Sequence, residues 1–157
     1  YLEEHRKEAM KMITLQNSYN LLQRRDEIAI TEIVQRENIG YLPYSPLAFG
    51  VLSGKYLEDA TPKKARVTLF PSYSRYSSEQ SLFATKKYNE IAKKHQISLT
   101  QMSLAFVNQL PFVTSNIIGA TTIEQLSENI KSIDITLSEE ILSEINEVHA
   151  QIPNPAP

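Results

Sequence analysis

Residues 117–129 hold the pattern in this sequence that best suits chemistry on a bound ligand. A short apolar run ends at Gly119, and Thr121 and Thr122 follow at once. Either threonine is a suitable N-cap for a helix. Glu124 or Gln125 follows at the position from which the partner residue of a capping box reaches back to the cap. The free N–H groups and partial positive charge of such a helix start can hold an anion. The same strand, glycine and helix order is also ordinary α/β architecture, so spacing alone leaves both interpretations open.

The hydrophobic pattern predicts strands that alternate with helices, which is typical of a parallel α/β sheet. Strands are expected at 11–17, 39–44 and 113–118, the last of them buried, and Thr100 is expected to cap the helix that follows it. Three parallel strands leave two open edges, so we interpret the chain as part of a larger β/α assembly. Helices are expected at 2–10, 26–37, 78–96, 101–110, 123–133 and 139–148, loops at 45–56 and 57–77, and a proline-rich, non-helical tail at 151–157.

Composition narrows the class of protein. The chain has 157 residues, a net charge of −2 and no cysteine. This length allows one domain with a real core, and the near-neutral charge favours neither nucleic acid nor an anionic membrane as a partner. The missing cysteines exclude disulfides and thiolate metal sites and fit a reducing cytoplasm. The apolar runs are too short to span a membrane. Because the chain opens without methionine in an expected helix, we expect a fragment.

Three ordered segments resemble the aldo-keto reductase superfamily, nearest to its Tas-like branch. They are residues 14–22, 44–56 and 119–129, and their order and spacing match the last three barrel strands of that family. The resemblance covers nearly the whole chain, 1–157. It implies an α/β fold: the C-terminal portion of an eight-stranded β/α (TIM-type) barrel, with about three parallel strands and flanking helices.

The resemblance also implies NADPH (NADP) as cofactor, bound in the loops after the last two strands. Gln16 matches the residue that holds the nicotinamide carboxamide, and Tyr44 matches the aromatic ring that stacks on the nicotinamide. Without the resemblance, Gln16 would be interpreted as a strand-end glutamine bonded to a neighbouring backbone group, and Tyr44 as a core tyrosine. The other implied cofactor-binding residues are Ser45, Leu47, Gly50 and Lys55 at the pyrophosphate, Pro46 in the same loop, Arg66 (with Arg75 as its rival) at a phosphate or the adenine, Gly119, Thr121 and Gln125 at the 2′-phosphate, and Glu128 and Asn129 at the adenine.

Two of the implied positions bear on the choice of cofactor. Thr121 and Gln125 are neutral, whereas other branches of the family place lysine and arginine there. A preference for NADPH over NADH would therefore rest on hydroxyl, amide and helix dipole, with Lys55 or Arg66 nearby.

The proton-transfer residues of the family have no match in this chain. The resemblance places its Asp, Tyr, Lys and His before residue 1, so we expect no catalytic residue here, and no metal site. His5, His95 and His149 lie on expected helices and are interpreted as surface residues. The implied partner is a small carbonyl substrate of the full-length enzyme, in the cytoplasm, with no nucleic acid and no membrane.

Three functions remain open at this stage. The chain is the cofactor-binding part of an NADPH-dependent aldo-keto reductase and is inactive alone. Alternatively it is a non-catalytic NADPH-sensing module, similar to potassium-channel β subunits. The third alternative is an inactive truncated product that self-associates through its open sheet edges.

Overall fold

The computed structural model describes residues 12–58, 62, 65–70, 72 and 74–156. The expected helix at 2–10 lies outside them. The elements follow one another in the order β1 (Thr14–Ser18), η1 (Arg25–Ile28), α2 (Ile30–Arg36), β2 (Gly40–Tyr44), η2 (Ala48–Ser53), α3 (Arg66–Leu69), α4 (Glu79–Lys94), α5 (Leu99–Asn108), α6 (Ile123–Lys131), η3 (Ser132–Asp134) and α7 (Glu139–Gln151).

The sheet is parallel, as the alternation of strands and helices predicted. β1 pairs with β2 in a register that sets Thr14 opposite Gly40 and Ser18 opposite Tyr44. The third predicted strand, 113–118, is not a strand in the structure. It makes two isolated parallel bridges, Tyr41 with Val113 and Tyr44 with Ile117. The segment therefore runs beside β2 but bonds to it only at intervals.

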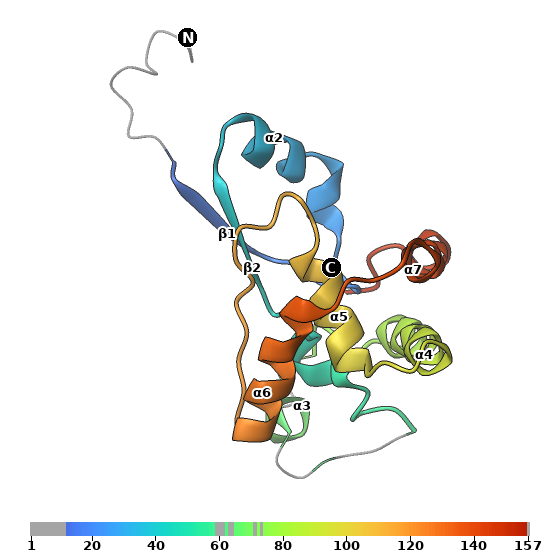
Figure 1. Ribbon diagram of the computed structural model, residues 1–157. Helices are drawn as coiled ribbons and strands as arrows, with labels where there is room; N and C mark the ends of the chain where they lie inside the picture. Colours follow the sequence, from blue (N-terminus) through green and yellow to red (C-terminus); the bar gives the residue numbers. More distant parts are fainter. Residues whose placement is uncertain (1–11, 59–61, 63–64, 71, 73, 157) are drawn as a thin grey trace, which may run out of the picture.

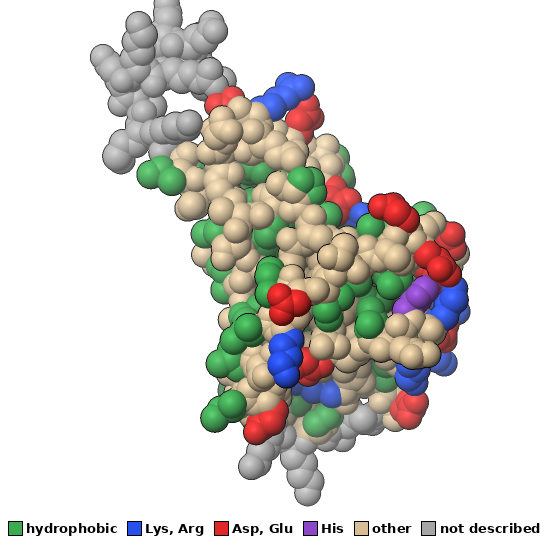
Figure 2. Space-filling view, in the orientation of Figure 1, with side chains coloured by type: hydrophobic (Ala, Val, Ile, Leu, Met, Phe, Trp, Pro, Cys, Tyr) green, Lys and Arg blue, Asp and Glu red, His purple; other side chains and the backbone are tan. Residues whose placement is uncertain are grey.

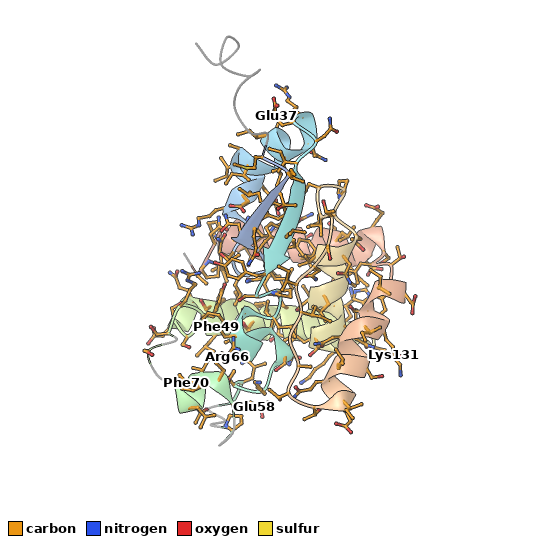
Figure 3. The ribbon with its side chains drawn as sticks, turned by 90° about the vertical axis from the view of Figure 1, so that its left-hand side faces the viewer. Glu37, Phe49, Glu58, Arg66, Phe70 and Lys131 are labelled. Atoms are coloured by element: carbon orange, nitrogen blue, oxygen red, sulfur yellow. The ribbon has the colours of Figure 1, made fainter. Side chains whose placement is uncertain are left out.

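Helices cover one side of this small sheet. In Figure 1 the strands lie to the left of α4, α5 and α7, and Figure 3 looks onto the sheet from that side. α5 contacts α4, α6, η2 and η3, and α4 also contacts α7, so α5 is central to the packing. The predicted burial of the α5 side chains is confirmed, since Leu104 and Val107 are fully buried and Phe106 is 3% exposed. Burying these side chains is the main stabilising contribution of the helix layer.

Several helix boundaries differ from the expectation for local reasons. Ser98, not Thr100, caps α5, because the Ser98 hydroxyl accepts a hydrogen bond from the backbone of Gln101 at 3.0 Å. The helix expected at 26–37 is divided at Ala29, whose φ of −150° is not helical. The expected loops contain two short helices, η2 and α3. Ser78 and Ser138 cap α4 and α7, each through a hydroxyl that accepts a backbone N–H of the first turn.

The C-terminal tail is held against the rest of the chain. The expectation of a non-helical tail holds after Gln151, the last residue of α7. The Asn154 side chain accepts a hydrogen bond from the backbone of Arg24 at 2.7 Å, and Ala156 donates to the carbonyl of Leu22 at 3.3 Å. The Pro155 carbonyl accepts from Ser81 at 3.0 Å. The tail therefore ties the turn after β1 to the start of α4.

Among the described residues, no helix combines the length and the apolar character that a membrane-spanning helix requires.

Candidate dinucleotide site

The two predicted phosphate segments leave the same end of the parallel strands. Ser45 follows β2 directly, and Gly119 follows the bridge between Tyr44 and Ile117. In α/β sheets, ligands bind at the carboxyl ends of the strands, where the loops converge. The fold thus places both loops where the site was expected.

The loop after β2 adopts an unusual backbone conformation. Ser45, Ala48 and Phe49 have φ values of 55°, 49° and 58°, and Gly50 has a φ of 89°. Left-handed conformations are costly for residues other than glycine, so surrounding contacts must hold them. One such contact is the hydrogen bond from the Asn20 amide to the Ser45 carbonyl, at 2.9 Å. Leu47 accepts the Gly50 N–H at 2.7 Å, and this bond closes the turn.

Gly50 leaves room for the side chain of Lys55. A Cβ atom at position 50 would lie 2.7 Å from Lys55 Nζ and 2.8 Å from its Cε, so any larger residue would displace the end of this flexible side chain. The ammonium lies 5.4 Å from the ring centre of Tyr56. Burial lowers the pKa of Lys55, and the nearby positive charge of Arg66 lowers it further.

Lys55 and Arg66 are two neighbouring cations without an acidic partner among the described residues. Within the described part of the chain, neither side chain makes an ion pair with a carboxylate. The Arg66 guanidinium lies over the ring of Phe49 at 5.6 Å, as the two labelled side chains of Figure 3 show. Two cations held close together without an acid attract an anionic ligand.

Gln16 and Tyr44 point to the same side of the sheet. Side chains alternate along a strand, and the register sets Gln16 opposite Leu42 and Ser18 opposite Tyr44. Tyr41 on β2 is fully buried toward the helices, whereas Gln16 is exposed and Tyr44 half-buried. The core alternative for Tyr44 is therefore not what the structure shows. Pro46, in contrast, is buried.

Arg75 lies beside the hydroxyl groups of Tyr44 and Tyr76, which raise the pKa of its guanidinium. The sequence left Arg66 and Arg75 as rivals, and the structure places them differently. Arg66 is near Lys55 and Phe49, whereas Arg75 is near the ring that the resemblance assigns to the nicotinamide. No spacing in the sequence pointed to this neighbour, because it depends on how the loop before α4 folds back.

The start of α6 is capped as the sequence indicated. The Thr122 hydroxyl accepts the backbone N–H of Gln125 at 3.2 Å, which identifies Thr122 rather than Thr121 as the cap. Gln125 reaches back and accepts two hydrogen bonds from Thr121, at 3.0 Å each. A Cβ atom at Gly119 would have no heavy atom within 4 Å, so the backbone there is open to approach.

The remaining two predicted residues on α6 have internal partners. Glu128 accepts a hydrogen bond from the Ser98 hydroxyl at 2.7 Å. The buried amide of Asn129 donates to the Gly119 carbonyl at 3.3 Å. Asn129 thus fixes the glycine turn, and its side chain is engaged within the protein.

Two cavities of the described chain lie away from these loops. One, of about 400 Å³, is at the amino ends of the strands, between Asn38, Gly40 and Phe112. The other, of about 300 Å³, lies between α4 and α7, beside Lys94 and Glu144. Neither cavity joins the loop after β2 to the start of α6.

The histidines of the described chain are not simple surface residues. The His95 side chain is 16% exposed and contacts Glu144 at 3.3 Å, close to Glu140. Lys94 pairs with Glu140 at 3.0 Å and with Glu144 at 2.6 Å, so a lysine already supplies the positive charge that the two carboxylates attract. His149 is half-buried, and its Nδ1 has no hydrogen-bond partner. His5 lies outside the described residues.

Comparison with known proteins identifies the class. The profile of the Aldo/keto reductase family matches residues 1–150, so the chain belongs to that family. Over 147 residues it is 47% identical to Protein tas of Escherichia coli (strain K12), covering 94% of this chain and 42% of that protein. It is 38% identical over 144 residues to an aldo-keto reductase of Babesia bovis, covering 87% of this chain and 50% of the relative. It is 33% identical over 138 residues to L-glyceraldehyde 3-phosphate reductase of Escherichia coli O157:H7, covering 84% of this chain and 40% of the relative.

The matches thus cover most of this chain but only part of each relative. The chain spans two fifths to half of the length of these relatives.

Proposed function

We propose that this chain is the dinucleotide-binding part of an NADPH-dependent aldo-keto reductase, an oxidoreductase that reduces small aldehydes or ketones in the cytoplasm. Family membership supports the oxidoreductase class, and one relative is named as a reductase of a phosphorylated aldehyde. The parallel order of β1, β2 and the 113–117 segment supports the C-terminal part of a β/α barrel. In such barrels the phosphate site lies in the last two strand-to-helix loops.

The observation that carries the proposal is the packing of Lys55 over Gly50. The loop has no side chain at position 50, adopts a left-handed backbone and brings an ammonium near Arg66, with no acid of the described residues paired to either cation. The two positive charges are already in place without a ligand, and they would suit the negative charges of a pyrophosphate. Repulsion between the two like charges opposes the favourable contacts that each cation makes with an aromatic ring, and an anionic ligand would relieve it.

The other residues fit the two ends of the same ligand. Gln16 and Tyr44 share the sheet face without a helix over it and would hold the nicotinamide, the amide by hydrogen bonds and the ring by stacking. The open turn at Gly119 and the capped start of α6 would hold the 2′-phosphate. When bound, NADPH supplies a hydride from C4 of the nicotinamide.

The proton-transfer residues belong, in this proposal, to strands outside the chain. The chain alone should therefore bind NADPH weakly, because part of the carboxamide shell is missing, and should not turn over. The absence of turnover is tested by incubating the purified chain with NADPH and a panel of aldehydes and following the absorbance of NADPH. Sustained oxidation by the purified chain would contradict the placement of the catalytic residues.

Binding is tested by titrating NADPH into the chain and following nicotinamide fluorescence. Lys55→Met should weaken binding roughly tenfold, because a charge-assisted phosphate contact contributes about 1.5–3 kcal/mol. Gly50→Ala should weaken it similarly, since the new methyl group displaces the ammonium and a φ of 89° disfavours alanine.

Lys87→Met is the matched control, because Lys87 lies on α4, where it pairs with Glu90 at 3.3 Å and lies over the ring of Phe83 at 5.8 Å. It should bind like the unsubstituted chain. Equal binding by Lys55→Met and the control would refute the phosphate assignment. Binding without turnover in a longer chain that carries the upstream strands would instead support the non-catalytic sensing module.

A further inference from the structure

A buried amide links the loop after β2 to two other segments of the chain. Asn20 lies in the turn after β1 and is fully buried. Its Nδ2 donates a hydrogen bond to the Ser45 carbonyl at 2.9 Å and another to the Tyr76 hydroxyl at 3.3 Å. Its Oδ1 accepts the backbone N–H of Leu22 at 2.9 Å. The side chain thus joins the turn after β1, the loop after β2 and the segment before α4.

The partners of Asn20 decide which end of its amide faces which segment. A backbone N–H only donates and a backbone carbonyl only accepts, so the oxygen must face Leu22 and the nitrogen must face Ser45. An aspartate of the same shape keeps the acceptor for Leu22 but cannot donate to Ser45. A serine can also accept the N–H of the residue two positions on, but its side chain is shorter and brings no amide to the loop. The amide therefore has two separable uses, one within its own turn and one toward the loop.

The Ser45 carbonyl is the acceptor at which the left-handed part of the loop begins. It accepts the Ala48 backbone N–H at 2.9 Å as well as the Asn20 amide. Ser45, Ala48 and Phe49 all have positive φ values, which residues other than glycine keep only when their surroundings hold them. The fully buried Tyr76 supplies a second hold, because its ring packs edge-to-face against Phe49 with centroids 5.0 Å apart. Asn20 contacts both Ser45 and Tyr76.

A buried amide with three partners would also suit a residue that only stabilises the fold. The direction of its bonds indicates a more specific role, because both bonds that Nδ2 donates leave the turn of Asn20. One of them fixes the backbone of Ser45, the residue that follows β2 directly. We propose that Asn20 is a positioning residue of the dinucleotide site, which holds the loop after β2 in the conformation that presents Ser45 and Lys55 to the pyrophosphate. The inference rests on the proposed function, to which it adds a buried residue that acts through Ser45.

Two substitutions remove the bond to the loop and keep an acceptor for Leu22. They are Asn20→Asp, which preserves the shape of the side chain, and Asn20→Ser, which adds no buried charge and serves where the aspartate variant folds poorly. In the full chain without ligand, hydrogen exchange of the Ala48 and Gly50 amides should be roughly tenfold faster in both variants, because a loop that has lost one hydrogen bond opens more often. Exchange at the original rate in the folded variants would overturn the proposal.

Ligand titrations separate a positioning role from a general loss of stability. NADPH should bind both variants roughly tenfold more weakly, because the loop must be ordered again when the pyrophosphate binds. Adenosine 2′-monophosphate has no pyrophosphate, so its affinity should stay that of the unsubstituted chain. An equal loss for both ligands would indicate general loosening of the fold. Faster exchange with unchanged NADPH affinity would assign Asn20 a structural role only, and each of these two results would overturn the proposal.

Asn108→Asp and Asn108→Ser are the matched controls. The Asn108 amide also donates and accepts, to Ser132 at 3.2 Å and from Asn116 at 3.0 Å, but it joins the end of α5 to η3. Both controls should keep the original exchange at Ala48 and Gly50 and the original NADPH affinity, and the same losses in them would refute a specific role of Asn20.

The proposed function and the positioning role fail in different ways. If the unsubstituted chain does not bind NADPH, the proposed function is refuted, and with it the ligand named here. If the unsubstituted chain binds NADPH and the Asn20 variants bind it equally well, the positioning role alone is refuted.

Discussion

At the scale of single residues, a partly buried ionic network around the buried Arg24 joins the start of η1 to α7. Arg24 pairs with Glu27 at 2.6 Å and bonds to Asn146 on α7 at 3.0 Å. Burial alone would raise the pKa of Glu27, but hydrogen bonds from Arg24 and Tyr19 outweigh burial and lower it. Removing one partner of a buried pair leaves the other charge uncompensated, which costs more than the pair itself contributes.

This network predicts how stability depends on pH. The folded-state pKa of Glu27 lies below its ordinary 4.5, so its contribution is present above pH 4.5 and is lost as pH falls through the folded value. Burial, and then the charge of Arg24, lower the pKa of His149 below 6.5, so the unfolded chain binds its proton first and stability declines below pH 6.5. Urea unfolding at a series of pH values should show both declines.

Substitutions separate the two contributions. His149→Gln should flatten the decline that begins at pH 6.5, and Glu27→Gln should flatten the decline below 4.5 while lowering stability at neutral pH. Glu32→Gln is the control, since Glu32 is exposed and pairs with Arg36 on the surface of α2. If Glu27→Gln and Glu32→Gln gave the same profile, the network would not carry the effect.

At the scale of elements, the start of α6 depends on one hydroxyl. Thr122→Ala removes the acceptor for the Gln125 N–H and should cost about 1 kcal/mol of unfolding free energy. Thr136→Ala, at an exposed position outside the helices, should cost far less. Urea unfolding measures both. A loss that is equal in the two variants would show that the cap does not hold this helix.

Elements were predictable where local chemistry decides them. α4 and α7 begin within one residue of the expected starts, because a serine before an acidic first turn is a local signal. The prediction of a strand at 113–118 was wrong. Its pairing depends on neighbours on both sides, and β2 supplies only one of them. The exposure of Ile123, Leu126 and Ile130 could not be read from their spacing, which gives α6 an apolar side but not the direction that this side faces.

The site was predictable to a similar extent. Resemblance gave the loops, and strand order put Ser45 and Gly119 at one end of the sheet. The room that Gly50 leaves for Lys55, and the position of Arg75 beside Tyr44, depend on the folded loop and have no signal in residue spacing. The individual cofactor contacts stay predictions.

At the scale of the whole molecule, the chain is closed on one side and open on the other. The tail and the helices α4, α5 and α7 enclose a core behind the sheet, with Tyr19, Tyr88 and Met102 almost fully buried. Within the described residues, no strand pairs with the side of segment 113–117 that faces away from β2, and the apolar side chains of Ile123 and Ile130 on α6 are exposed, along an edge where Figure 2 shows hydrophobic side chains. A protein with its binding loops at the boundary between these sides would complete its ligand site only when the open side is covered.

Hydrogen exchange with and without millimolar NADPH tests the central claim most directly, because it reads both loops in one experiment. If the loop after β2 and the start of α6 form one dinucleotide site, backbone amides at 45–56 and at 119–125 should be protected together. Amides of α2, at the other end of the sheet, should not change. Protection of neither segment, or of α2 to the same degree, would contradict the account.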